Sequence, residues 1–311
     1  GGPTTPITFR HFERQVDSAY VELSLPLFGA GNERPGAYRL AVNAAVRYDD
    51  YSDVGDTTNT KFGVSWQPTR GLTLRGSYGT SFRAPLITQI YGNSNNLYVH
   101  NYQNPAGGPT ITGVALSGVN LGLKPEEATT WSVGLDWEAF DGLRLSLTYF
   151  DVNYENQVDA YLSNLAILSR EADFAGTGII LRGAAAAQRV AQEMANGIVV
   201  LGALPGGTPD NITVFVDGRS QNLGVSNTRG FDFQAAWRLA ATEAGNFTFN
   251  VNGSYLTDFE VAITSAAPLI DRLDTIFNPL KLKLRGGVSW DRGPLQASIM
   301  ATYVGGYTNN A

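Results

Sequence analysis

Histidine and cysteine, the residues most often used for nucleophilic and metal chemistry, are almost absent from this chain. Its 311 residues include two histidines and no cysteine, so thiolate metal sites and disulfides are excluded. His11 and His100 stand in neither a zinc-binding motif nor a recognisable catalytic triad motif. The sequence therefore predicts no catalytic residue, no cofactor and no bound metal.

One acidic cluster has the short spacing that calcium ligands often show. Asp49, Asp50, Asp53 and Asp56 supply carboxylate oxygens within a few residues of one another, and calcium prefers oxygen ligands. The cluster lacks the central glycine and the terminal glutamate of a calcium loop at the required offsets. We therefore expect a solvated outer turn here, with calcium binding as the less favoured alternative.

Aromatic and amide side chains gather in one short segment of the chain. The candidate ligand-contact residues are Tyr91, Asn95, Tyr98, His100 and Tyr102. Aromatic rings interleaved with amides can stack on a sugar or an aromatic siderophore and donate hydrogen bonds to it. Ligand contact is the functional hypothesis for this segment, and a loop that packs on its neighbours is the ordinary alternative.

Basic side chains recur at the polar positions of several predicted strands. The candidate residues for one polar face are Arg39, Arg47, Arg75, Arg83, Lys281, Lys283 and Arg285, together with Asp232. Such a face would attract an anion or contact a separate domain, but ordinary wetting of a water-filled interior is the favoured explanation. The net charge is −6 and no basic run is present, so we expect no nucleic-acid partner.

These side chains must be positioned by strands, because hydrophobicity alternates along most of the chain. Leu40, Val42, Ala44, Val46 and Tyr48 share one parity, and polar residues fill most of the positions between them. A period of two residues predicts a strand with one apolar and one wet face. About ten residues at ~3.3 Å each, tilted by roughly 45°, span about 23 Å, close to the apolar band of an outer-membrane barrel.

About ten segments show this alternation. They cover approximately residues 18–27, 39–49, 61–67, 72–83, 131–137, 143–149, 231–238, 247–255, 280–290 and 295–303. The phase of the sixth segment becomes unclear after Phe150, where a bulge would explain it. No apolar run approaches the ~18 residues of a membrane-spanning helix, so a membrane protein with this sequence must be a closed sheet.

Aromatic residues lie mainly at the ends of the apolar faces. They are Trp66, Phe82, Trp137, Trp237, Trp290 and Tyr303. Indole and phenol rings favour the bilayer interface, where the ring is in apolar surroundings and the polar tip is wet. A soluble two-layer sandwich, whose bulky residues would sit at mid-strand, is the disfavoured alternative.

The connections between the predicted strands alternate between short and long. Short turns are expected at residues 68–71, 141–142 and 291–293, and the Asp-Gly pair at residues 141–142 is a strong hairpin signal. Long connections are expected at residues 49–59, 84–128, 156–225 and 257–279. This alternation is typical of short periplasmic turns and long extracellular loops.

The longest connection, residues 156–225, contains a predicted helix at residues 184–195. Asn196-Gly197 would end this helix, and Val190 and Met194 would share one of its faces. We expect the helix to pack the loop against its surroundings, with partner binding as the alternative.

Four parts of the chain resemble signatures of the TonB-dependent outer-membrane receptors. Ser81-Phe82-Arg83-Ala84-Pro85, followed by Gln89-Ile90-Tyr91, resembles the strand-to-loop motif of this family. Asn120-Leu121-Gly122-Leu123-Lys124-Pro125-Glu126 resembles the segment that leads into the next strand. Arg47-Tyr48-Asp49-Asp50-Tyr51-Ser52 and Arg229-Gly230-Phe231-Asp232 resemble two further signatures. Each is weak alone, but their order and their positions at strand ends make them jointly specific.

Three positions depart from the family pattern. Gln89 stands where the family usually has Glu, Leu121 replaces a Pro, and Ser132 stands where Glu is common. The departures leave the subfamily and the ligand open.

The resemblance implies an all-β, transmembrane antiparallel β-barrel, of which residues 1–311 form a partial wall of about ten strands. Family barrels close at about 22 strands, so we expect the plug domain, the TonB box and the final strands to lie outside this sequence. The start, Gly1-Gly2-Pro3, has no signal-peptide pattern.

The implied function is uptake of a scarce, bulky solute across the bacterial outer membrane. Siderophores, cobalamin and oligosaccharides are the candidate ligand classes. The implied partners are outer-membrane lipid, the receptor's own plug domain, the TonB complex of the inner membrane and the small-molecule ligand. The basic polar face would then line the lumen. Two alternatives remain. One is a complete ten-stranded barrel enzyme of protease or lipase type, which would need a catalytic cluster with His11 or His100 at its outer rim, and the other is a soluble β-rich binding module.

Overall fold

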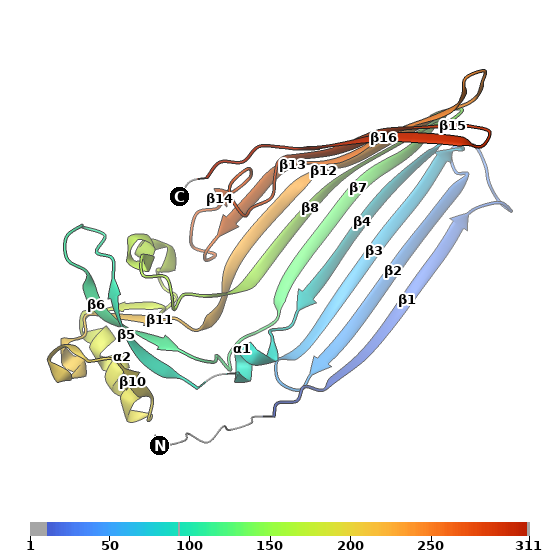
Figure 1. The fold of residues 1–311 in the computed structure, drawn as a ribbon. Helices are drawn as coiled ribbons and strands as arrows, with labels where there is room; N and C mark the ends of the chain where they lie inside the picture. The colour runs from blue at the N-terminus through green and yellow to red at the C-terminus, as the bar shows by residue number, and fades with distance from the viewer. Residues whose placement is uncertain (1–10, 93, 310–311) are drawn as a thin grey trace, which may run out of the picture.

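The computed structural model describes residues 11–92 and 94–309 and shows one large curved sheet and one small sheet (Figure 1). The start at Gly1-Gly2-Pro3 lies outside the described residues. Ten antiparallel strands follow one another across the large sheet, and the short strand β14 (Ile270–Asp271) pairs with β13 beside them. The ten are β1 (Val16–Phe28), β2 (Arg39–Tyr51), β3 (Gly55–Thr69), β4 (Leu72–Arg83), β7 (Glu126–Phe140), β8 (Leu143–Ala160), β12 (Ser220–Thr242), β13 (Gly245–Ala262), β15 (Leu282–Arg292) and β16 (Leu295–Val304).

The pairing register places the predicted apolar residues in rows on one face of the large sheet. Val42 pairs with Val64, Val64 with Gly76, and Gly76 with Val133. Val133 remains 51% exposed, because no second sheet formed by the described residues packs against this face. The two-layer sandwich is therefore wrong, and the apolar face is the outer surface of a barrel wall.

The end of the wall with the short turns carries indole rings in the orientation expected at a bilayer interface. Trp66 donates a hydrogen bond from Nε1 to the carbonyl oxygen of Gly36 at 2.9 Å, and Trp290 donates to that of Ala244 at 2.6 Å. Each ring therefore lies on the apolar face while its N–H is satisfied by a turn. The prediction of aromatic residues at strand ends is confirmed for these two positions.

The prediction of a long connection at residues 49–59 is wrong. Tyr51 pairs with Gly55, so only residues 52–54 connect β2 to β3, and Gly55 has the positive φ of +83° that so tight a turn needs. The ladder continues through Asp49, Asp50 and Asp56 although these residues are polar. Hydrophobic alternation marks only the apolar band of a strand and cannot show how far the strand extends beyond it.

Strand β8 likewise continues past the point where its alternation becomes unclear. Its irregularity lies near Asn156, which has a φ of +55°, opposite a shifted register around Gly224 of β12. The bulge suspected after Phe150 is therefore found about six residues farther along the strand.

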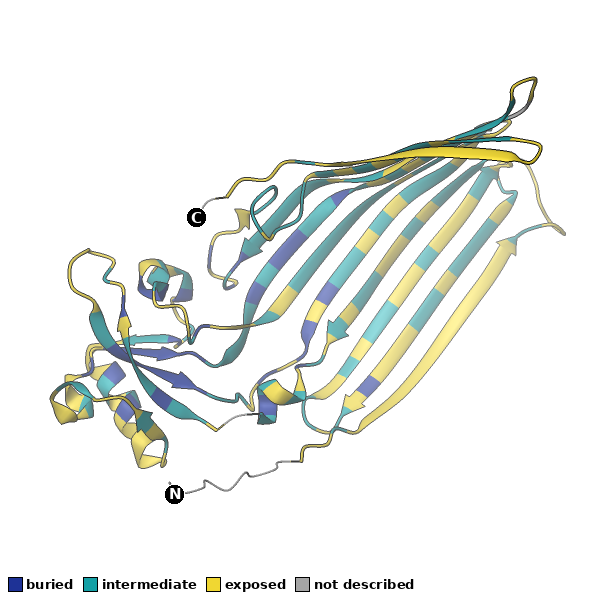
Figure 2. Ribbon diagram, viewed as in Figure 1, coloured by how far each residue is buried: buried dark blue, intermediate teal, exposed yellow. Residues whose placement is uncertain are grey.

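The two longest connections form the small sheet, which sequence reasoning missed. Its strands are β5 (Asn96–Tyr102), β6 (Ile111–Ser117), β9 (Ile180–Arg182), β10 (Val199–Leu201) and β11 (Val214–Asp217), in the order β10-β5-β6-β11-β9. Figure 2 shows that buried residues are concentrated in this sheet, whereas the barrel wall is mostly intermediate or exposed. The molecule's fully packed core thus lies in its loops.

Helices are few and belong to the same connections. Helix α1 (Ile87–Tyr91) follows β4, and helix α2 (Gly183–Ala195) confirms the helix predicted at residues 184–195. Gly197, with a φ of +83°, follows its C-terminal end. Val190 is completely buried, whereas Met194 is 38% exposed, so α2 packs the loop mainly through its middle. Within the described ranges, no helix has the length and apolar character needed to span a bilayer.

Candidate functional site: lumen, rim and extracellular sheet

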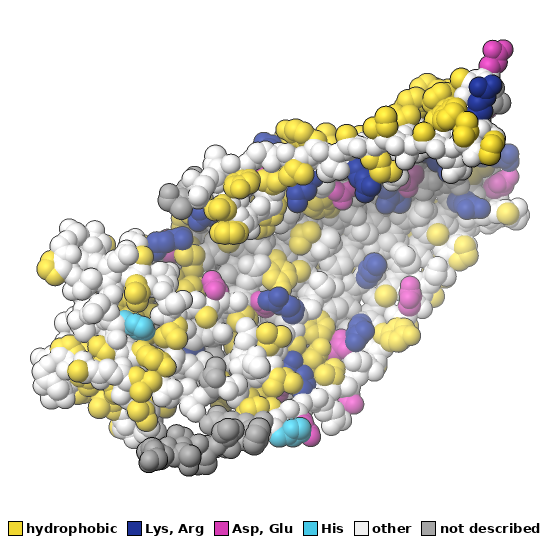
Figure 3. Space-filling view, in the orientation of Figure 1, with side chains coloured by type: hydrophobic (Ala, Val, Ile, Leu, Met, Phe, Trp, Pro, Cys, Tyr) yellow, Lys and Arg dark blue, Asp and Glu magenta, His cyan; other side chains and the backbone are white. Residues whose placement is uncertain are grey.

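The concave face of the wall carries the polar and charged side chains. Figure 3 shows basic and acidic groups inside the trough formed by the strands. Arg75 lies here and forms an ion pair with Asp136, with 2.6 Å between Nε and Oδ2. It also donates hydrogen bonds to Ser146 and Thr148 of β8. The positive charge of Arg75 is therefore locally neutralised.

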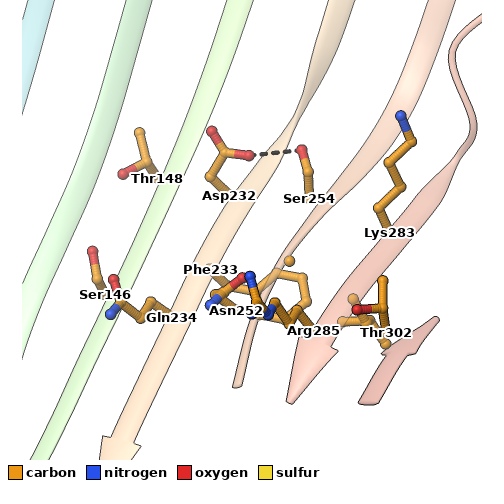
Figure 4. Close-up of a pocket in the computed structure, with 12 residues that line it drawn as sticks. Ser146, Thr148, Asp232, Phe233, Gln234, Asn252, Ser254, Lys283, Arg285 and Thr302 are labelled. Atoms are coloured by element: carbon orange, nitrogen blue, oxygen red, sulfur yellow. Dashed lines mark hydrogen bonds between the residues drawn. The ribbon is translucent and has the colours of Figure 1, made fainter. Parts of the chain in front are cut away.

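A basic area remains on β15, where Lys283 and Arg285 share the concave face of the strand. Within the described part of the chain neither side chain has a carboxylate partner, and Arg285 contacts Sδ of Met300 at 3.1 Å. Both line a hollow of about 430 Å³, in which Asp232 accepts a hydrogen bond of 2.7 Å from Ser254 (Figure 4). This area has the character of a contact surface for an anionic group.

The other predicted members of the basic face have different surroundings. Arg47 is paired with Asp49 at 2.8 Å, and the Nζ atom of Lys281 lies 5.6 Å from the ring centroid of Tyr255. Arg39 begins β2 at the end of the wall with the short turns. The residues thus span the height of the wall and do not form one cluster.

Two of the family-like motifs meet at the rim where the long loops begin. Glu126 opens β7, is 1% exposed and lies directly opposite Arg83, the last residue of β4. It accepts hydrogen bonds from Arg83 Nη2 at 2.7 Å, Tyr154 Oη at 2.8 Å and the backbone N–H of Val158 at 2.6 Å. A second bond to Glu126 comes from Arg83 Nε. Arg83 is therefore committed to a rim clamp that joins β4, β7 and β8.

A second clamp joins the same motif to strand β12. The Asn222 side chain accepts a hydrogen bond from Lys124 N and donates one to Lys124 O, both at 2.8 Å. It also donates to the carbonyl oxygen of Asn156 at 2.9 Å. Asn120 donates to the carbonyl oxygen of Ser220 at 2.9 Å. Sequence reasoning missed Asn222. A single asparagine near the start of a strand gives no indication of the distant segment whose backbone its side chain will contact.

Two of the four carboxylates of the acidic cluster are occupied by protein donors. Asp49 accepts hydrogen bonds from Arg47 and Ser18, and Arg14 binds Asp53 with its Nε atom at 2.9 Å. Among residues 11–92 and 94–309, no group of three or more acidic or histidine side chains is arranged to hold a metal ion. Asp49 and Asp53 thus form ion pairs at the barrel rim.

The five candidate ligand-contact residues are distributed over the small sheet and its approach. Tyr91 ends α1 and stacks on Phe12 with 5.3 Å between ring centroids. The side-chain oxygen of Asn95 accepts a hydrogen bond of 2.9 Å from the backbone of Val119. Tyr98, His100 and Tyr102 alternate along β5 and lie on one face, with 6.0 Å between successive ring centroids.

Tyr102 occupies the interior of the small sheet. Its side chain is completely buried, its hydroxyl has no hydrogen-bond partner within the described residues, and burial raises its pKa above the ordinary value. Its position is that of a core residue. Ligand contact would require the small sheet to open here.

Tyr98 lines a hollow of about 430 Å³ between the small sheet and the barrel rim. Asn96, Ser117, Arg219 and Ser220 line the same hollow. Sequence reasoning missed Arg219, whose guanidinium binds Asp217 at 2.6 Å. The sequence does show that a polar turn containing Arg219 follows the apolar run Val214–Val216. It does not show that this turn lies beside Tyr98 in the folded chain.

Neither histidine has the surroundings of a catalytic base. His11 is exposed and its Nε2 atom lies 2.7 Å from Glu13. The His100 ring lies between Tyr98 and Tyr102, and its Nε2 atom is buried without a hydrogen-bond partner among the described residues. No observation therefore favours the barrel-enzyme alternative.

The curved sheet, its short turns and its elaborated loops define a wall segment of an outer-membrane type of β-barrel. The chain belongs to the family described as TonB dependent receptor-like, beta-barrel, whose model matches residues 1–311.

Curated relatives match a part of the chain. A hemin receptor of Yersinia enterocolitica is 29% identical over 131 residues, which cover 38% of this chain and 18% of the relative. A ferric enterobactin receptor of Pseudomonas aeruginosa is 30% identical over 118 residues, covering 38% of this chain and 15% of the relative. The matches thus span less than a fifth of the length of these relatives.

Solved structures show the same fold. A mutant form of the ferric enterobactin receptor of Pseudomonas aeruginosa aligns with a TM-score of 0.60 at 16% identity, covering 94% of this chain and 32% of that chain. The siderophore receptor PirA from Acinetobacter baumannii aligns with a TM-score of 0.58 at 17% identity, covering 93% and 33%.

Proposed function

We propose that this chain is part of the wall of an outer-membrane receptor that imports a scarce, bulky solute with energy from the TonB complex. The single observation that carries the proposal is a barrel wall with an apolar outer face, a polar lumen face and a folded extracellular sheet on its long loops. Membership of the family supports a transport role over an enzymatic one.

Among the solute classes considered, iron complexes have the most support. The relatives named above are receptors for hemin and for ferric enterobactin. We therefore propose a siderophore-type or haem-type iron complex as the solute. Its first contact would be the hollow lined by Tyr98 and Arg219.

The wall requires further strands and a plug in the complete receptor. The outer edges of β1 and β16 have no partner strand among the described residues. In lipid each unpaired backbone group costs several kcal/mol. We propose that neighbouring strands of the same barrel pair with both edges. The basic area at Lys283 and Arg285 would then contact an acidic group of the plug or of the passing solute.

Uptake measurements on the full-length receptor test the proposal. In a host that lacks other iron receptors, Tyr98→Ala and Arg219→Ala are expected to weaken binding of the transported iron complex about tenfold or more, since each removes a hollow-lining contact. Gln188→Ala, on the exposed side of α2, is the matched control in the same loop.

Two results separate the parts of the proposal. Loss of uptake on deletion of the TonB complex, with unchanged binding, would support energised transport. Uptake that survives this deletion would refute energised transport, and unchanged binding by both hollow variants would refute this ligand contact while leaving transport intact.

A further inference from the structure

The two longest loops of the barrel are interleaved in one sheet. Strands β5 and β6 belong to the loop between β4 and β7, whereas β9, β10 and β11 belong to the loop between β8 and β12. The hairpin of the first loop lies between two strands of the second, because β10 pairs with β5 and β11 pairs with β6, both in parallel. The hairpin cannot leave without breaking a ladder on each side.

Each of the two hydrophobic clusters of the small sheet combines residues from both loops. On one face, Leu97 and Val114 of the first loop pack with Val190 and Phe215 of the second. On the other face, Tyr102 of the first loop packs with Phe174 of the second. Separation of the loops would expose both clusters to water, which the hydrophobic effect opposes.

Four chain crossings connect this sheet to the barrel rim, and they lie close together. A Cβ atom at Gly118 would lie 2.6 Å from Cα of Asn95, and one at Gly218 would lie 2.7 Å from Cα of Leu162. The backbone N–H of Gly218 donates to the carbonyl oxygen of Leu116 at 2.8 Å, which ties the crossings of the two loops to each other.

The hollow beside Tyr98 lies at these crossings. Its lining comes from all four of them: Asn96 and Ser117 from the first loop, and Leu162 and Arg219 from the second. Below the crossings, the Glu126 and Asn222 clamps hold the bases of the same loops on the rim. The sheet is therefore held together by pairing and packing between both loops. Its junction with the barrel is partly hollow at the four crossings and also includes the loop after β13, where Thr264 donates a hydrogen bond of 2.6 Å to the carbonyl oxygen of Asp173.

We propose that residues 94–119 and 161–219 form one cooperatively folded cap, which moves as a single body on the four crossings. A solute that touches either loop then displaces both, and a solute in the hollow fixes the position of the cap relative to the rim. The cooperativity is independent of the solute's identity, so its failure would leave the proposed transport function standing.

Hydrogen–deuterium exchange of the full-length receptor in nanodiscs tests the cap. Val190→Asp places a charge in the buried face of α2, in the second loop. Because the cap opens as one unit, this change is expected to raise amide exchange about tenfold or more in β5 and β6, which carry no substitution. Amides of β3 in the barrel wall are expected to exchange as before.

Gln188→Asp introduces the same charge on the exposed side of α2 and is expected to change nothing in β5 or β6. Val190→Ala is the milder second variant, in case Val190→Asp prevents assembly; it is expected to give a smaller rise in the same amides. Faster exchange confined to the second loop would overturn the proposal, as would an equal effect of Gln188→Asp on β5 and β6.

Discussion

The buried carboxylate of Glu126 offers the sharpest test of how the rim is held together. Substitution with Ala leaves the Tyr154 hydroxyl and the Val158 N–H without their acceptor in a position where Glu126 is 1% exposed. An unsatisfied buried donor costs about 1–3 kcal/mol. Arg83 contributes less to the loss, because 68% of its side chain is accessible and water can replace the carboxylate. Two donors together give an expected local destabilisation of about 2–6 kcal/mol.

Local amide exchange is the suitable assay, because it reports the opening free energy of the rim without requiring the barrel to unfold. A loss of 2 kcal/mol corresponds to roughly thirtyfold faster exchange, since 1.4 kcal/mol is a factor of about ten. The effect should be centred on the end of β8 near Val158 and on the first residues of β7. The middle of each strand should retain its protection.

Glu127→Ala is the matched control, one residue away. Glu127 is exposed and lies directly opposite Glu155 in the β7–β8 ladder, so its removal also eliminates a like-charge pair and should be neutral or slightly stabilising. If Glu126→Ala left exchange at the rim unchanged, or if Glu127→Ala accelerated it equally, the rim clamp would have no energetic role.

Two further predictions concern charge and burial. Asp17, Asp50 and Asp56 are direct neighbours across three strands. Asp50→Asn should therefore stabilise the wall by about 0.5 kcal/mol, because it removes the repulsion between these carboxylates. Thermal unfolding of the variant and the wild type in low and high salt should show that the stability gain becomes smaller as the salt concentration rises. Tyr102→Phe should be neutral or stabilising for the cap by amide exchange, because the hydroxyl is buried without a partner. Burial raises the pKa of Tyr102 above its ordinary value of 10.0. The wild-type cap should therefore lose stability as pH rises above about 10, where the unfolded tyrosine ionises first, and a loss of equal size in Tyr102→Phe would refute this assignment.

The sequence alone predicted the strands of the barrel wall and their two faces, although not the full length of each strand. Each long strand alternates between lipid-facing and polar residues, and this period of two is a local property that needs no knowledge of the partner strand. The same pattern also restricts the register, because slipping by one residue would turn Val64 or Val133 to the polar face. Short motifs such as Ser81–Pro85 identified the family for the same reason, since each is contiguous in the chain.

Tertiary structure decided everything that depends on residues far apart in the chain. The contact between Arg83 and Glu126 exists because β4 and β7 pair after a loop of 42 residues. Strands β9 and β10 have three residues each. Strand β10 finds its hydrogen-bond partner in β5 of the neighbouring loop, and β9 finds its partner in β11, farther along the same loop. Strand β11 is buried on both faces, so its residues show no alternation that could reveal it.

The candidate site illustrates the same division. Tyr98 and Tyr102 look alike in the sequence, two alternating positions apart on one strand face, yet Tyr98 lines the hollow and Tyr102 lies in the core. Residue type and spacing determined which face of β5 they share. The second loop decided which of the two rings meets water. The packing of this loop buries apolar surface from segments about a hundred residues apart in the chain.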